Sequence, residues 1–166
     1  MIIYKNTASG FREDVDTNKI SDKVEDLYLR IRSRNLSRQE KSSINNSMSF
    51  MEKIIRRSEV SDDCGVMIEY IVPATNNRID FVISGEDENG KKNFIIVELK
   101  QWQIAEATDR DGIVRTHLGG SINDTTHPSY QAHSYKQFLT DFNENIFDGS
   151  VYPFSCAYLH NYSEKS

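Results

Sequence analysis

The chain has 166 residues, 37% of them hydrophobic, and a formal net charge of −5. This length is that of one domain with a substantial core. The acidic balance excludes a protein that coats nucleic acid by bulk positive charge, although it is compatible with an enzyme that carries a local basic patch. No apolar run approaches the roughly 18 residues of a membrane span, and the N-terminus lacks the apolar stretch of a signal peptide. The widely separated Cys64 and Cys156 indicate a cytoplasmic protein with reduced thiols.

The first 60 residues have the periodicity of helices. Apolar residues at helical spacing predict a helix over residues 20–34. A second helix is expected to begin after Ser37, because Ser37 and Glu40 form a capping box in which each side chain bonds a free backbone amide. Apolar residues at helical spacing then continue to Ile55.

From residue 61 the pattern changes to that of strands. Strands are expected over residues 66–72, 79–84 and 94–100, separated by turn clusters at 73–77 and 86–91. The third strand is apolar without interruption, which predicts a place at the sheet centre. Residues 101–127 show no clear period and are expected to form a long loop, followed by a helix over about 128–147 and a strand over 153–160.

The predicted order of elements is α-α-β-β-β-α-β, with no internal repeat and no linker. We therefore expect one α/β domain over residues 1–166, built around a mixed sheet flanked by helices. Its two parts are a helical segment at 1–60 and a sheet core at 61–166 that carries the candidate site.

Four charged residues interrupt the apolar strands, although ionised side chains are seldom buried unless paired. They are Glu69, Asp80, Glu98 and Lys100. If the second hairpin is centred on Asn89, Asp80 lies opposite Glu98, and Lys100 shares the face of Glu98. If the first hairpin is centred between Ala74 and Thr75, Glu69 lies opposite Asp80. The sequence then brings three carboxylates and one ammonium group into one patch.

Three adjacent carboxylates repel one another, and Lys100 alone cannot neutralise them. Mg²⁺ or Mn²⁺ would do so, held by Asp80, Glu98 and the backbone carbonyl of Leu99, with Glu69 as a further ligand. Lys100 would then orient or deprotonate an attacking water. In the alternative, the carboxylates are rim residues and Lys100 merely pairs with one of them.

These residues carry a resemblance to a known family. Asp80 followed by Glu98-Leu99-Lys100 resembles the D…ExK signature of the PD-(D/E)XK nuclease superfamily, and Gln131 with Tyr135 is similar to the QxxxY pattern of its RecB-like members. The stretches IEYIVPATNNRIDFVISG, NFIIVELKQW, THLGG and HPSYQAHSYKQF also resemble the N-terminal nuclease-like domain of bacterial proteins in which a helicase ATPase domain follows.

The resemblance implies a restriction-endonuclease-like fold and a Mg²⁺-dependent nuclease that works with a helicase ATPase. Its expected substrate is DNA, and RNA is the alternative. It assigns the active site to Glu69, Asp80, Glu98 and Lys100, with Gln131 and Tyr135 positioning the strand that is cut. Two alternatives stay open. One is a catalytically silent module of the same fold that binds nucleic acid or a helicase, and the other is a subunit whose substrate is presented by a partner.

A run of basic residues follows the first predicted helix. It comprises Arg30, Arg32, Arg34, Arg38 and Lys41. These side chains form either a solvated face with favourable helix-end charges or a local track for phosphates.

Overall fold

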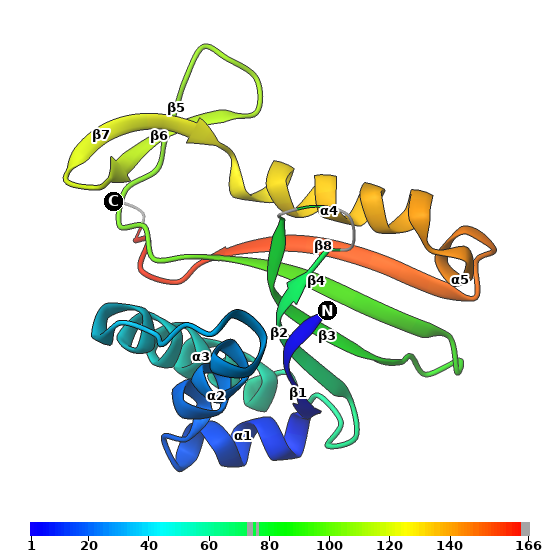
Figure 1. Ribbon diagram of the computed structural model, residues 1–166. Helices are drawn as coiled ribbons and strands as arrows, with labels where there is room; N and C mark the ends of the chain where they lie inside the picture. The colour runs from blue at the N-terminus through cyan, green and yellow to red at the C-terminus, as the bar shows by residue number, and fades with distance from the viewer. Residues whose placement is uncertain (73–74, 76, 164–166) are drawn as a thin grey trace.

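The computed structural model describes residues 1–72, 75 and 77–163 (Figure 1). Its main sheet has five strands in the order β1-β2-β3-β4-β8: β1 (Ile2–Thr7), β2 (Gly65–Ile71), β3 (Arg78–Glu86), β4 (Lys92–Lys100) and β8 (Val151–Leu159). Neighbouring strands are antiparallel except for the parallel pair β4–β8. The predicted α/β class with a mixed sheet is therefore confirmed.

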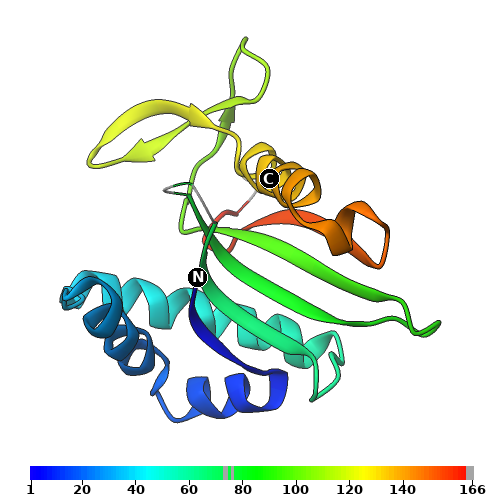
Figure 2. The same ribbon diagram turned by 45° about the vertical axis from the view of Figure 1, so that its right-hand side comes forward.

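Helices cover both faces of this sheet (Figures 1 and 2). On one face lie α1 (Ala8–Asp16), α2 (Ile20–Arg32) and α3 (Arg38–Arg57), and on the other α4 (Pro128–Phe142) with the short α5 (Glu144–Phe147). Each layer has its own apolar core. The first contains Phe11 and Phe81, both fully buried, and the second contains Ile96 and Leu139.

Local signals in the sequence account for how α2 ends and α3 begins. Ser33, at φ 49°, has a left-handed conformation and ends α2. In the predicted capping box, the Ser37 hydroxyl accepts from the Glu40 amide at 3.2 Å, and the Glu40 carboxylate accepts from the Ser37 amide at 2.8 Å. Both bonds satisfy backbone groups that the first turn of a helix leaves free.

The turn between β3 and β4 fixes the register of the site. Gly90 takes φ 72°, and the Asp87 carboxylate accepts from the amides of Asn89 and Lys91 at 2.8 and 3.0 Å. Phe81 then lies opposite Val97, which is the register predicted from a hairpin centred on Asn89. The turn expected at 73–77 lies partly outside the described residues, but the β2–β3 register also agrees with the prediction.

Three expectations were wrong. Strand β1 and helix α1 were not predicted, and because β1 pairs with β2, the segment 1–60 is not purely helical. Residues 101–127 are not a loop, because β5 (Glu106–Ala107), β6 (Ile113–Leu118) and β7 (Ser121–Thr126) form a second sheet that projects from the first (Figure 1). Strand β7 has no buried face, so no hydrophobic period marks it. The helix expected over 128–147 breaks at Asn143, which separates α4 from α5.

The sequence also predicts two reduced cysteines and no membrane-spanning helix. Cys64 and Cys156 are both free thiols. In the described part of the chain, none of the helices combines the length and the apolar character that crossing a bilayer requires.

The centre of β4 supports both the sheet and the candidate site. We expect Ile96→Ala to lower the free energy of unfolding by about 2–5 kcal/mol, because Ile96 is fully buried and its truncation leaves a cavity. Chemical denaturation measures this change. Ile122→Ala is the matched control, since Ile122 is 61% exposed on β7, and it should change the same quantity by less than about 1 kcal/mol. Equal effects would contradict the assignment of β4 to the core.

Candidate active site

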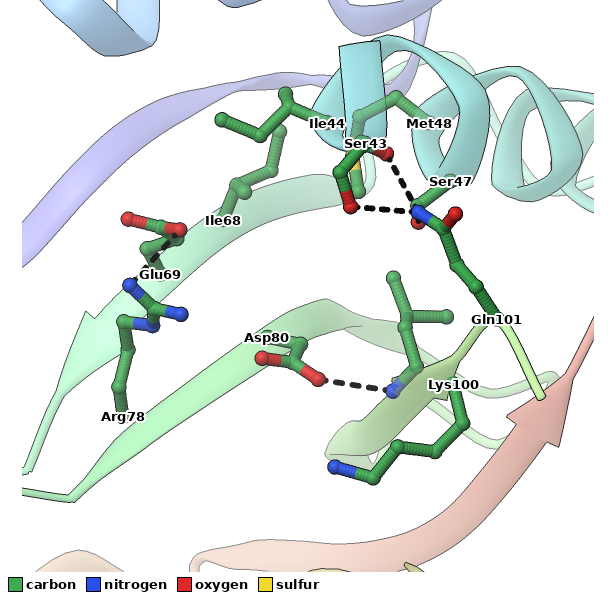
Figure 3. A pocket seen from close by; sticks show the side chains of 11 residues that line it. Ser43, Ile44, Ser47, Met48, Ile68, Glu69, Arg78, Asp80, Lys100 and Gln101 are labelled. Atoms are coloured by element: carbon green, nitrogen blue, oxygen red, sulfur yellow. Dashed lines mark hydrogen bonds and ion pairs between the residues drawn. The ribbon is translucent and has the colours of Figure 1, made fainter. Parts of the chain in front are cut away.

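The candidate site lies where β3 and β4 separate. Their ladder ends at the pair Phe81–Val97, while β3 extends to Arg78 and β4 to Lys100. Beyond the last pair, the Asp80 carboxylate accepts a hydrogen bond of 3.0 Å from the Leu99 amide (Figure 3). The Asp80 side chain therefore accepts the hydrogen bond that a backbone carbonyl of β3 would accept in a regular ladder. This bond fixes its carboxylate in the fork between the two strands.

Glu98 and Lys100 share one face of β4, as their spacing predicts. Lys100 Nζ donates to Glu98 Oε1 at 2.6 Å. Glu98 is only 1% exposed, and its Oε2 atom has no hydrogen-bond partner within the described residues. A buried carboxylate oxygen without a partner is costly, so this position favours either a proton or a cation.

The electrostatics of Glu98 and Asp80 reflect their burial and their closeness. Burial raises the pKa of Glu98 to about 7, the negative charge of Asp80 adds to the effect, and the Lys100 ammonium opposes it. Burial likewise raises the pKa of Asp80, against the hydrogen bond from the Leu99 amide. Such a pair is stable only when a proton or a cation reduces its charge.

Strand geometry is distorted beside this pair. Glu69 lies in β2 with φ 53°, a conformation that residues other than glycine rarely adopt within a strand. On either side of it, Ile68 packs in the core under α1–α3, whereas Tyr70 packs in the core under α4, so the usual alternation is broken. The same break occurs in β3, since Ile79 and Phe81 lie in different cores.

This distortion separates Glu69 from the other two carboxylates. Its Oε1 atom lies 3.1 Å from Arg78 Nη1, and Figure 3 shows Glu69 and Arg78 facing each other on one side of the pocket, apart from Asp80 and Lys100. Among the described residues, no group of three or more His, Cys, Asp or Glu side chains is placed to hold a metal ion. The expectation of three converging carboxylates is therefore wrong. Asp80 and Glu98 come together, and Glu69 is held by a cation of its own.

Gln131 and Tyr135 lie on one face of α4, as their spacing predicts. Gln131 Nε2 donates to the Tyr135 hydroxyl at 2.8 Å. Burial raises the pKa of Tyr135, and the charge of Glu98 raises it further, so the ring lies within electrostatic reach of the carboxylate pair. Gln131 also lines the same cavity as Glu98 and Lys100. Gln131 and Tyr135 are thus grouped with Asp80, Glu98 and Lys100 near the fork between β3 and β4, and Glu69 lines the smaller cavity beside Asp80 and Lys100.

Two cavities meet at this fork. One, of about 280 Å³, opens toward α3 and is the pocket drawn in Figure 3. The other, of about 640 Å³, opens toward α2 and α4. Arg78, Asp80 and Lys100 line both cavities, and Glu98 lines the larger one. The carboxylate pair is therefore deep in the protein and yet accessible to a ligand.

Several residues around the fork were not predicted. Arg78 pairs with Glu69 and donates to the Tyr28 hydroxyl at 2.7 Å, although in the sequence Tyr28 is only one apolar position of a helix. Gln101 ties the end of β4 to α3, because its Nε2 atom donates to the hydroxyls of Ser43 and Ser47 at 2.6 and 3.2 Å (Figure 3). Only the position of Gln101 directly after Lys100 could have suggested its importance.

The donor set fits a hard divalent cation. Asp80 and Glu98 offer carboxylate oxygens in one place, and the unpartnered, buried Oε2 atom of Glu98 is what such a cation would satisfy. Mg²⁺ is commonly held by one or two carboxylates and completes its shell with water. The fit therefore requires no third carboxylate.

Comparisons with known proteins assign no family. No family model, curated protein or solved structure matches the chain. What the site can do follows from its own side chains.

The raised pKa of Glu98 predicts a pH dependence of stability in the absence of metal. A carboxyl group whose pKa is higher in the folded state than its ordinary 4.5 stabilises the fold below that value and loses this contribution as pH rises through about 7. We therefore expect Glu98→Gln to be more stable than the parent at pH 8 by about 1–3 kcal/mol. Near pH 4.5 the two proteins should be similar.

Urea denaturation in a metal chelator at several pH values measures this difference. Glu88→Gln is the control, because Glu88 is exposed in the β3–β4 turn and undergoes the same change of charge. A difference between Glu98→Gln and the parent that does not vary with pH would contradict the prediction.

Proposed function

We propose that this chain is a Mg²⁺-dependent nuclease that hydrolyses phosphodiester bonds of DNA, with RNA as the alternative substrate. The observation that carries the proposal is the pair of half-buried Asp80 and buried Glu98, with Lys100 bound to Glu98, in the lining of an open cavity. A carboxylate pair with one adjacent ammonium group is suited to metal-assisted attack of water on a phosphate ester.

The fold supports the same proposal. The order α3-β2-β3-β4-α4-β8, with three antiparallel strands and a last strand parallel to β4, resembles the restriction-endonuclease-like arrangement that the sequence motifs imply. Asp80, Glu98 and Lys100 occur at the fork of its central strands. The helicase ATPase partner and the cytoplasmic location rest on the resemblance and on the two free thiols.

Each residue has a distinct role in this proposal. Asp80 and Glu98 would hold the cation with the Leu99 carbonyl, and the cation, when bound, stabilises the negative charge that builds up on the phosphate. Lys100 is positioned by Glu98 to orient the attacking water and to offset that charge. Gln131, held by the Tyr135 hydroxyl, would orient the strand at the cavity wall. Glu69 acts indirectly, because it fixes Arg78 beside Asp80.

Metal binding is expected to stabilise the fold. A ligand that binds only the folded state at 100 times its Kd adds about 2.7 kcal/mol, so titration with Mg²⁺ should raise the Tm of the parent protein. Asp80→Asn should abolish most of this rise, while Glu88→Gln should retain it. Thermal unfolding with and without Mg²⁺ provides the measurement. If Mg²⁺ raised the Tm of Asp80→Asn as much as that of Glu88→Gln, the cation would not be bound by Asp80, and the prediction would be contradicted.

Cleavage is expected to depend on the same residues. Asp80→Asn and Lys100→Met should each reduce the Mg²⁺-dependent nicking of plasmid DNA by at least about 100-fold, because each removes a charge that acts on the reacting phosphate. Gel analysis of plasmid nicking, with Glu88→Gln as control, tests this. Nicking that persists in both site variants would refute the assignment. DNA binding without any nicking in the parent protein would instead select the catalytically silent module.

A further inference from the structure

We propose that Arg32 and Arg34 form a phosphate-binding wall of the larger cavity, so that the carboxylate site accepts one extended nucleic-acid strand. A phosphate adjacent to the one being hydrolysed would lie on this wall. The inference rests on the proposed nuclease function and specifies how the substrate enters. Both arginines line the 640 Å³ cavity that also contains Asp80, Glu98 and Gln131.

The end of α2 explains why these two arginines reach the cavity. Arg32 is the last residue of the helix, and Ser33 adopts the left-handed conformation that reverses the chain after it. Arg34 then lies against Tyr28, with its guanidinium carbon 5.4 Å from the ring centroid. The turn at Ser33 therefore brings two guanidinium groups, two positions apart in the sequence, to the same wall.

The arginines differ in how they are held. Arg34 is fixed by Tyr28 and by an ion pair of 2.8 Å with Glu40. Arg78, which lines the same cavity, is bound to Glu69 and to the Tyr28 hydroxyl. Arg32 forms no ion pair within the described part of the chain. The wall thus combines Arg34, which is held in place, with Arg32, whose donors are available to a ligand. Guanidinium groups bind phosphate oxygens in a bidentate manner.

The distribution of charge in the cavity suits a polyanion. Its floor is acidic, because Asp80 and Glu98 lie there, and an anionic strand would be repelled without cations on the approach. Arg32 and Arg34 supply them from α2 and its following turn, while Gln131 lines the cavity from α4 with a neutral amide. A strand that crosses the cavity from α2 to α4 would pass over the carboxylate pair.

A purely structural explanation of these arginines is that their positive charges complement the helix dipole at the C-terminal end of α2. Arg30 separates the two explanations. It lies in the last turn of α2, as Arg32 does, and it is exposed, but it does not line the cavity. Lys41, a further member of the basic run, is engaged by Asp22 and Glu25. Of the basic run from Arg30 to Lys41, only Arg32 and Arg34 line this cavity.

The test compares Arg32→Ala with Arg30→Ala in the full chain. The two variants lose the same charge from the same helical turn, and their Tm values report whether both fold. Fluorescence anisotropy with a labelled single-stranded DNA oligonucleotide in a metal chelator measures binding without cleavage. We expect Arg32→Ala to weaken binding about 3- to 10-fold and to reduce the salt dependence by about one phosphate contact. Arg30→Ala should stay within about twofold of the parent, and Arg32→Lys should recover part of the loss.

The outcomes separate this inference from the proposed function. Equal affinities for Arg30→Ala and Arg32→Ala, or no binding of the oligonucleotide by the parent protein, would overturn the arginine wall. If Arg32 governs binding while Mg²⁺ produces no cleavage, the wall stands and the nuclease assignment fails. If the protein cleaves DNA with equal efficiency in both variants, the nuclease assignment stands and the wall fails.

Discussion

The close approach of two buried carboxyl groups is the interaction around which the site is organised. Asp80 and Glu98 lie on neighbouring strands where the backbone ladder has ended, and the charge of Asp80 disfavours the ionised form of Glu98. Lys100 offsets one charge, and the Leu99 amide stabilises the other. Burial of Glu98, together with the negative charge of Asp80, raises the pKa of Glu98 to about 7, so that without a cation a proton reduces the charge of the pair. A divalent cation would replace that proton.

Maintaining this arrangement requires irregular strands. The alternation of side chains is broken at Glu69 in β2 and next to Asp80 in β3, and the left-handed conformation of Glu69 costs about 1–3 kcal/mol. The parallel pairing of β4 with β8, which continues to Lys100, holds the free end of β4 from the other side. Gln101 then attaches this end to α3. The site therefore lies on a rigid strand even though one of its ladders has opened.

Much of this geometry was predictable because it depends on local signals. The Asn-Gly turn determined the register of Phe81 with Val97, and hence the closeness of Asp80 and Glu98. Spacing alone placed Gln131 and Tyr135 on one helix face. The position of Glu69 was not predictable, because a backbone dihedral, and not the register, turns its side chain toward Arg78. Strand β1 was missed since it is a short strand at the sheet edge, and the β6–β7 hairpin was missed since it packs against little.

The charge of the chain also fits this arrangement. A net charge of −5 repels a polyanion at long range, so any affinity for nucleic acid has to come from cations concentrated at one place. In the proposed nuclease, Asp80 and Glu98 and the guanidinium groups of Arg32 and Arg34 line the same cavity, with Glu98 almost fully buried. An anionic strand meets the arginines before it meets the carboxylates. A site of this kind can act on a phosphodiester chain without the basic surface by which nucleic-acid-binding proteins are usually recognised, because attraction and chemistry come from adjacent but separate sets of side chains.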